Sequence, residues 1–120
     1  MCADELVVHT ECEETVLVVR LEGELVWPAA RGLSTRVQEC LPAGRAATVI
    51  DLSGVRFLDS SGVAALLALY RSLAEAQAVV AFARPTPLIE RLLAIVGLHD
   101  HLPLYDTLEA ARRAAGSPAP

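Results

Sequence analysis

The 120-residue chain contains no lysine and no asparagine, and all ten of its basic residues are arginine. The absence of lysine excludes Schiff-base chemistry and the lysine of a phosphate-binding loop, and the absence of asparagine excludes any site that needs its amide. Aromatic residues make up only 4% of the sequence, whereas hydrophobic residues make up 53%. This composition predicts a globular chain with an aliphatic core.

Long apolar runs are also absent. The longest, Val63–Tyr70, is about a third of a membrane-spanning helix, so no membrane insertion is expected. Met1–Glu5 is acidic where a signal peptide would be basic, which favours a cytoplasmic protein. The net charge is −5, and Arg20 is the one base among residues 1–24, so no basic stripe is available and no direct nucleic-acid partner is expected.

Patterns for cofactors, metals and catalysis are missing as well. Cys2, Cys12 and Cys40 fit neither a disulfide framework nor a zinc site, and Cys40 is expected to be a small core or interface residue. His99 and His101 flank an acid in a loop; polar surface is the ordinary interpretation, and a metal ligand or base is the alternative. No nucleophile elbow, dinucleotide fingerprint or phosphate loop occurs. We therefore predict no catalytic residues, no metal, no cofactor and no enzymatic activity.

Apolar runs and helix or turn signals alternate along the chain and predict the order ββαβαβαβα. Strands are predicted at 5–9, 15–22, 46–52, 78–82 and 102–105, and helices at 28–40, 61–76, 87–96 and 106–115. Single helices connect the strands that follow an initial hairpin at 10–14, so the predicted fold is α/β, with a mixed, largely parallel five-stranded sheet and four helices. Residues 1–116 are expected to form a single domain, and residues 117–120 a disordered tail.

Individual residues refine this prediction. Pro28 is suited to the first turn of a helix, and Trp27 before it is expected to anchor the helix entry, with a partner contact as the alternative. Asp106 and Glu109 have the spacing of a capping box. Asp51 closes the third predicted strand, as a receiver-type phosphoacceptor would, but the lysine and the clustered acids of that chemistry are missing.

The segment between the third strand and the second helix contains two adjacent hydroxyls, Ser60 and Ser61, after Asp59. The start of a helix offers free backbone N–H groups and the positive end of the helix dipole, which favour an anion, whether bound or covalently attached. Alternatively, Asp59 or Ser60 simply caps the helix. The first two turns of this helix are apolar nearly all round, which indicates either complete burial or a surface for a partner.

From about residue 5 to residue 115 the chain resembles the STAS domain, and within it the bacterial anti-sigma factor antagonists; four segments in the same order carry the resemblance. These segments are Gly23-Glu-Leu25, Asp51-Leu-Ser-Gly-Val-Arg-Phe-Leu-Asp-Ser-Ser-Gly62, Arg91-Leu-Leu-Ala-Ile-Val-Gly-Leu98 and Leu104-Tyr-Asp-Thr-Leu-Glu-Ala-Ala111.

The resemblance implies a phosphorylation switch. The unmodified antagonist binds an anti-sigma factor that is also a serine kinase, and thereby releases a sigma factor. The kinase uses ATP to phosphorylate the serine after the motif aspartate, which is Ser60 here, with Ser61 less favoured. The phosphorylated antagonist dissociates from the kinase, and a PP2C-type phosphatase removes the phosphate. The partner-binding residues implied are Asp59, Ser60, Ser61, Gly62, Val63, Glu24 and Val26.

One residue and one short segment depart from the antagonist pattern. Val26 stands where the family commonly has aspartate, and Val63-Ala64-Ala65 stands where antagonists often have Leu-Gly. The second departure is closer to other STAS subunits, including the small cytoplasmic component of phospholipid ABC transporters. The alternative function is therefore a constitutive interaction subunit of such a transporter, or a stress-signalling scaffold, in which Ser60 is only a cap.

Overall fold

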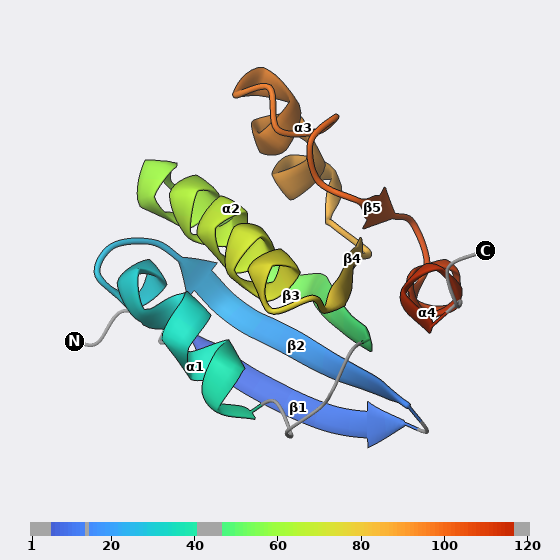
Figure 1. Ribbon diagram of the computed structural model, residues 1–120. Helices are drawn as coiled ribbons and strands as arrows, with labels where there is room; N and C mark the ends of the chain where they lie inside the picture. Colours follow the sequence, from blue (N-terminus) through green and yellow to red (C-terminus); the bar gives the residue numbers. More distant parts are fainter. Residues whose placement is uncertain (1–5, 14, 41–46, 117–120) are drawn as a thin grey trace.

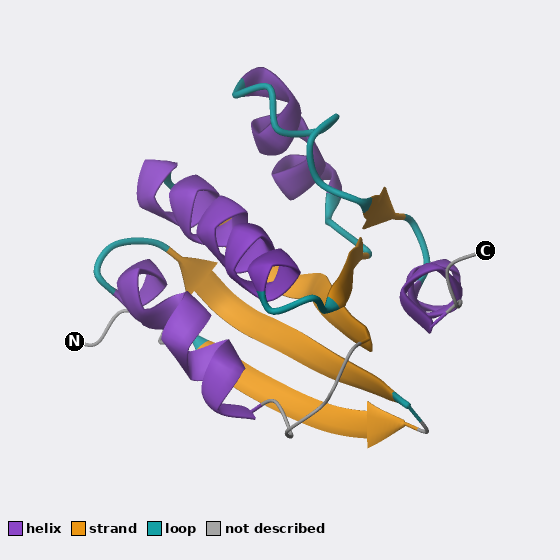
Figure 2. Ribbon diagram, in the orientation of Figure 1, coloured by secondary structure: helices purple, strands orange, loops and turns teal. Residues whose placement is uncertain are grey.

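The computed structural model describes residues 6–13, 15–40 and 47–116, which form one sheet and its covering helices (Figures 1 and 2). The predicted order ββαβαβαβα is confirmed, with a short 3-10 turn, η1, before the first helix. The elements are β1 (Val7–Glu13), β2 (Val16–Leu25), η1 (Ala29–Gly32), α1 (Leu33–Cys40), β3 (Ala47–Leu58), α2 (Ser60–Glu75), β4 (Val79–Ala83), α3 (Pro87–Ile95), β5 (Leu104–Tyr105) and α4 (Leu108–Gly116).

The five strands lie in the order β1-β2-β3-β4-β5. As predicted, β1 is antiparallel to β2, and the other neighbours are parallel. The β2–β3 ladder runs from Val16–Ala47 to Leu25–Leu58, whereas β4 pairs only with residues 47–51 of β3. The far ends of β2 and β3 therefore extend past β4, and α2 begins at this extension.

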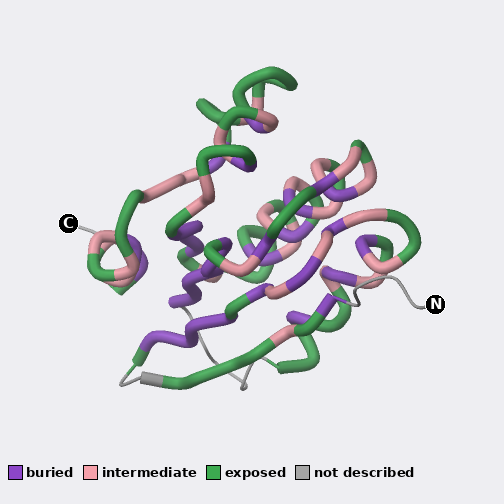
Figure 3. Tube along the Cα trace, turned by 180° about the vertical axis from the view of Figure 1, so that it is seen from behind, coloured by how far each residue is buried: buried purple, intermediate pink, exposed green. Residues whose placement is uncertain are grey.

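Helices cover the two faces of the sheet unequally (Figures 1 and 3). Side chains of α1, α2 and α3 pack into one large apolar core, and α4 packs alone against a smaller cluster on the opposite face. Residues 47–52 of β3 are buried throughout, as expected for a central strand covered on both sides. In α1, Leu33 and Val37 are four residues apart and fully buried, so they form the inward side of the helix.

The first three strands are longer than the sequence predicted, whereas β5 (Leu104–Tyr105) is shorter than the strand predicted at 102–105. β1 continues through the acidic segment predicted as a hairpin, and Glu11 pairs with Val18. β2 and β3 were predicted to end near Gly23 and Leu52 but continue to Leu25 and Leu58, because the two strands pair with each other. Ser53 and Gly54 are local break signals, which this long-range pairing overrides. Gly54 instead allows close approach, since a Cβ there would lie 2.7 Å from the carbonyl oxygen of Leu21.

Two helix starts also differ from the prediction. The chain after Pro28 first makes the 3-10 turn, and the α-helix begins at Leu33. The capping box predicted to begin at Asp106 is wrong, because the cap of α4 is Thr107, whose hydroxyl oxygen accepts from the N–H of Ala110 at 3.0 Å. Aspartate ranks slightly above threonine as a cap, so cap preference alone favoured Asp106 over the neighbouring Thr107.

The ends of α3 agree with the sequence prediction, whereas the position of Cys40 does not. Thr86 caps α3 and Gly97 follows its end at φ +82°, which agrees with the helix predicted at 87–96. Cys12 and Cys40 are exposed, so a core position for Cys40 is wrong. Cys2 and the predicted tail at 117–120 lie outside the described residues. Within the parts of the chain that the structure describes, the helices lack the combined length and apolarity needed to cross a membrane.

Candidate functional site

The first turn of α2 lies directly against the end of β2. The backbone N–H of Asp59 donates to the carbonyl oxygen of Leu25 at 3.4 Å. A Cβ at Gly62 would lie 2.0 Å from that same oxygen and 2.8 Å from the Cβ of Leu58. Glycine at position 62 is therefore what allows the helix to start this close to the sheet.

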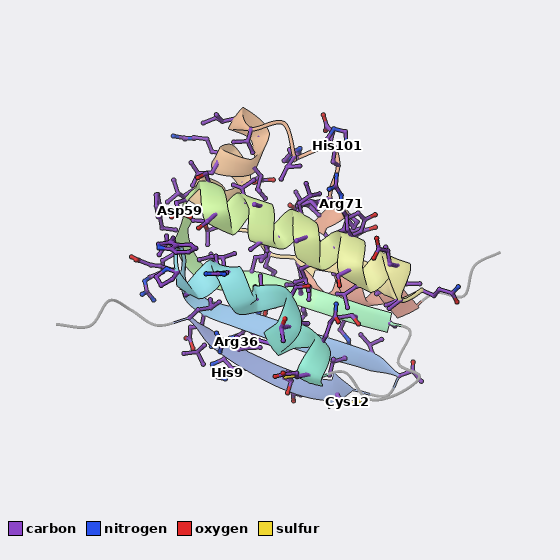
Figure 4. All side chains as sticks on the ribbon, turned by 60° about the vertical axis from the view of Figure 1, so that its left-hand side comes forward. His9, Cys12, Arg36, Asp59, Arg71 and His101 are labelled. Carbon is purple, nitrogen blue, oxygen red and sulfur yellow. The ribbon has the colours of Figure 1, made fainter. Side chains whose placement is uncertain are left out.

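The cap of α2 is Asp59 and not Ser60, the other residue that the sequence offered for this role (Figure 4). One carboxylate oxygen accepts from the N–H of Gly62 at 3.0 Å and from the hydroxyl of Ser61 at 2.6 Å. The other oxygen accepts from the backbone N–H of Trp27 at 3.2 Å. The hydrogen bond from Ser61, with those from the backbone N–H groups of Gly62 and Trp27, holds the pKa of Asp59 below its ordinary value despite some desolvation.

The two adjacent serines are in different environments. Ser61 is half-buried, and its hydroxyl donates to Asp59. Ser60 is the first residue of α2 and is exposed; its hydroxyl makes no hydrogen bond to any residue that the structure describes. Ser60 is thus the accessible hydroxyl at the positive end of a 16-residue helix.

The other predicted partner-binding residues lie around this helix start. Glu24 and Val26 are half-buried at and just beyond the end of β2, and the Trp27–Asp59 hydrogen bond ties this segment to the cap. Val63 is half-buried and packs against the core. Gly62 is buried, so its geometric role is the close approach of helix and strand.

The apolar start of α2 has one buried and one exposed side. Leu66 and Leu69 are fully buried, whereas Ala64 and Ala68 are exposed. The helix is therefore not buried on every side, and the side that follows Ser60 presents small apolar groups to solvent.

Trp27 is exposed to 59%, so the prediction that it anchors the helix entry is wrong. The guanidinium carbon of Arg31 lies 5.7 Å from the centroid of its ring. Phe57, two residues before Asp59, is also exposed, to 43%. Neither Arg31 nor Phe57 was predicted at the site, and the one available signal in the sequence was that the only tryptophan precedes a proline.

A second polar group lies on the sheet face beside α4. Asp51 is buried and lies within β3 instead of closing it. Arg84 contacts it with Nη2 at 2.6 Å from Oδ2 and Nε at 3.3 Å from Oδ1. Burial raises the pKa of Asp51, but hydrogen bonds from Arg84 and Ser53 outweigh this effect and leave the pKa lowered.

Asp51 and Arg84 line an open cavity of about 590 Å³, together with Arg20 and Glu11. Two cations thus face two carboxylates, so the cavity has no excess charge that would select an ionic ligand.

The histidines lie on the surface. His99 is exposed and lies 3.6 Å from carboxylate oxygens of Glu90 and Asp100, and His101 is exposed nearby (Figure 4). Among the described residues, no group of three or more histidine, cysteine or acidic side chains is arranged to hold a metal ion.

The family model described as the STAS domain matches residues 7–111. The chain belongs to the STAS domain family. The Anti-sigma F factor antagonist of Paenibacillus polymyxa is 29% identical to this STAS protein over 102 residues, which cover 84% of this chain and 87% of the relative. A solved anti-sigma factor antagonist from Mycobacterium paratuberculosis is 30% identical, with a TM-score of 0.81 and coverage of 94% and 96% of the two chains.

The anti-sigma factor antagonist SpoIIAA in its unphosphorylated form shares the fold of this STAS protein at 23% identity, with a TM-score of 0.70 and coverage of 94% and 100%. SpoIIAA of Bacillus has also been solved in a phosphorylated form. The resemblance to anti-sigma factor antagonists stated from the sequence is thus confirmed.

Proposed function

We propose that this STAS protein is a non-enzymatic anti-sigma factor antagonist that phosphorylation of Ser60 switches off. The surface around the start of α2 binds an anti-sigma factor that is also a serine kinase, and this binding releases a sigma factor. The kinase transfers the γ-phosphoryl group of ATP to the Ser60 hydroxyl, which loses its proton. The phosphorylated form dissociates, and a PP2C-type phosphatase hydrolyses the phosphate ester to restore the hydroxyl.

The observation that carries the proposal is the separation of the cap from the exposed hydroxyl. Asp59 satisfies the helix start with its own carboxylate, so Ser60 is free to react without any loss of a native hydrogen bond. Ser61 would have to break its 2.6 Å hydrogen bond to Asp59 first. The geometry therefore favours Ser60 over Ser61 as the modified residue.

The same geometry supports a switch in binding without a change in fold. A phosphate at Ser60 adds about 1.5 to 2 negative charges, which the N-terminal end of a helix tolerates. Against a partner that covers Ser60 and the small apolar residues beyond it, these charges must be desolvated next to Asp59. Unfavourable charges at an interface cost several kcal/mol, so we expect the complex to dissociate while the domain stays folded.

Phosphorylation by the anti-sigma factor kinases of the source organism tests the assignment. We expect mass spectrometry to find one phosphate on Ser60 after incubation with ATP, and none in Ser60→Ala. The matched control Ser61→Ala should remain a substrate, because it keeps the exposed hydroxyl. Absence of phosphate on Ser60 with every such kinase would contradict the proposal.

Affinities measured by titration calorimetry test the charge mechanism. Ser60→Asp should bind the anti-sigma factor at least about tenfold more weakly than wild type, a loss of about 1.4 kcal/mol. Ser60→Asn, which has nearly the same shape without the charge, should bind more tightly than Ser60→Asp. Equal binding by the two variants would show that charge is not the switch. Recovery of a transporter ATPase instead of a kinase in pull-downs would support the constitutive-subunit alternative.

A further inference from the structure

Trp27 is a large exposed aromatic residue whose backbone is tied to the segment that carries Ser60. The residue is 59% exposed, and its backbone N–H donates to Asp59, the residue immediately before Ser60. The position of the Trp27 backbone is thus fixed by the same carboxylate that caps α2. A partner that covers Ser60 is therefore expected to reach the Trp27 segment as well.

The side chain of Arg31 contacts the ring of Trp27. The turn η1 is closed by hydrogen bonds from the N–H of Ala30 to the carbonyl of Val26 at 2.9 Å and from the N–H of Arg31 to the carbonyl of Pro28 at 3.1 Å. This turn holds the guanidinium of Arg31 5.7 Å from the ring centroid of Trp27, within the range of a cation–π contact. Among the described residues no carboxylate forms an ion pair with Arg31, so its charge is available to another molecule.

We propose that Trp27 and Arg31 form an anchor that selects the anti-sigma factor. The indole ring enters an apolar pocket of the partner, and the guanidinium pairs with a carboxylate at the rim of that pocket. Tryptophan and arginine are the side chains most enriched among residues that dominate binding energy, and two aromatic or cationic groups held in a fixed geometry lose little entropy on binding. This inference rests on the proposed function, since it names a contact of the same interface.

Three variants test the anchor in the full-length protein against the purified anti-sigma factor. We expect Trp27→Ala to weaken binding at least about tenfold. Arg31→Glu should weaken it more than Arg31→Ala, because it places a carboxylate against the proposed carboxylate of the partner. Both side chains are exposed and the N–H of residue 27 is kept, so the unfolding midpoints should stay close to wild type.

Val79→Ala is the matched control for loss of an exposed apolar side chain. Val79 is 47% exposed and pairs with Ala47 at the opposite end of the 12-residue strand β3, about 36 Å along the strand from Leu58, the residue before Asp59. It should bind with wild-type affinity. Fluorescence gives a second readout, because Trp27 is the only tryptophan of the chain: its emission should shift to the blue on binding an anti-sigma factor whose own tryptophans have been replaced.

The outcomes separate the two proposals. If wild type binds and Ser60→Asp binds weakly, while Trp27→Ala binds as tightly as Val79→Ala, the anchor is overturned and the proposed function stands. If wild type binds no anti-sigma factor, both are overturned. Weaker binding by Trp27→Ala together with the blue shift in wild type supports the anchor.

Discussion

Substitution of Gly62 by alanine is the sharpest test of how α2 is seated on the sheet. The new Cβ would lie 2.0 Å from the carbonyl oxygen of Leu25, whereas carbon–oxygen contacts need about 3.3 Å. The helix start must therefore move away by roughly 1.3 Å, the difference between these two distances. This movement would break the hydrogen bond from the Asp59 N–H to the carbonyl oxygen of Leu25, which is already 3.4 Å long. We expect a loss at the upper end of the range for overpacking, about 3 kcal/mol.

Urea unfolding followed by circular dichroism at pH 7 measures this loss, with the free energy of unfolding extrapolated to water. Gly32→Ala is the control, because nothing lies within 4 Å of a Cβ at that position. It should be neutral or should stabilise the protein by up to about 1 kcal/mol, by restricting the unfolded chain. A change of less than about 0.5 kcal/mol in Gly62→Ala would refute the close approach of α2 and β2.

Two further predictions concern the carboxylates. Arg84→Ala leaves Asp51 buried without its guanidinium and should cost about 2 kcal/mol at pH 7, below the full penalty for a buried pair because the Arg84 side chain is 43% exposed. The pKa of Asp51 is lowered in the folded protein, so the ionised Asp51 stabilises the fold above its unfolded pKa, and this stabilisation is lost as the pH falls through its folded pKa. The loss of stability in Arg84→Ala should therefore shrink when urea unfolding is repeated at acid pH. The loss caused by Arg84→Ala should also be smaller in a protein that already carries Asp51→Asn. Asp59→Ala removes three hydrogen bonds from the start of α2 and should cost about 1 to 2 kcal/mol by the same assay, whereas Ser60→Ala should change the free energy of unfolding by less than about 0.5 kcal/mol.

The order of the elements was predictable because it depends on local patterns. Each buried strand is a short apolar run between break signals, and the alternation with helices leaves few arrangements of a parallel sheet. Helix ends with one clear signal were also predictable, as at Thr86 and Gly97. These features are properties of a few neighbouring residues, which the sequence displays directly.

The lengths of β2 and β3 were not predictable, because they depend on contacts between residues far apart in the chain. Gly54 is a break signal by its own propensity, and only the proximity of Leu21 shows that it belongs inside a strand. The exposure of Trp27 has a similar origin. A large apolar side chain is expected inside, and its position outside follows from the turn η1 and the hydrogen bond to Asp59.

The segment that forms the candidate site was predictable, but not which of its residues caps the helix and which presents an exposed hydroxyl. Asp59 and Ser60 are both preferred caps at a helix start, so the sequence leaves the cap open between them. The structure assigns this role to Asp59, because its second carboxylate oxygen is also held by Trp27. A cap residue that is itself modified would lose its hydrogen bond, and each modification would cost the domain about 1 kcal/mol. With the cap on Asp59, a phosphate on Ser60 leaves every described hydrogen bond of the helix start in place. In the proposed switch, the unfavourable free energy of the phosphate therefore acts on binding at the partner surface, while the fold persists.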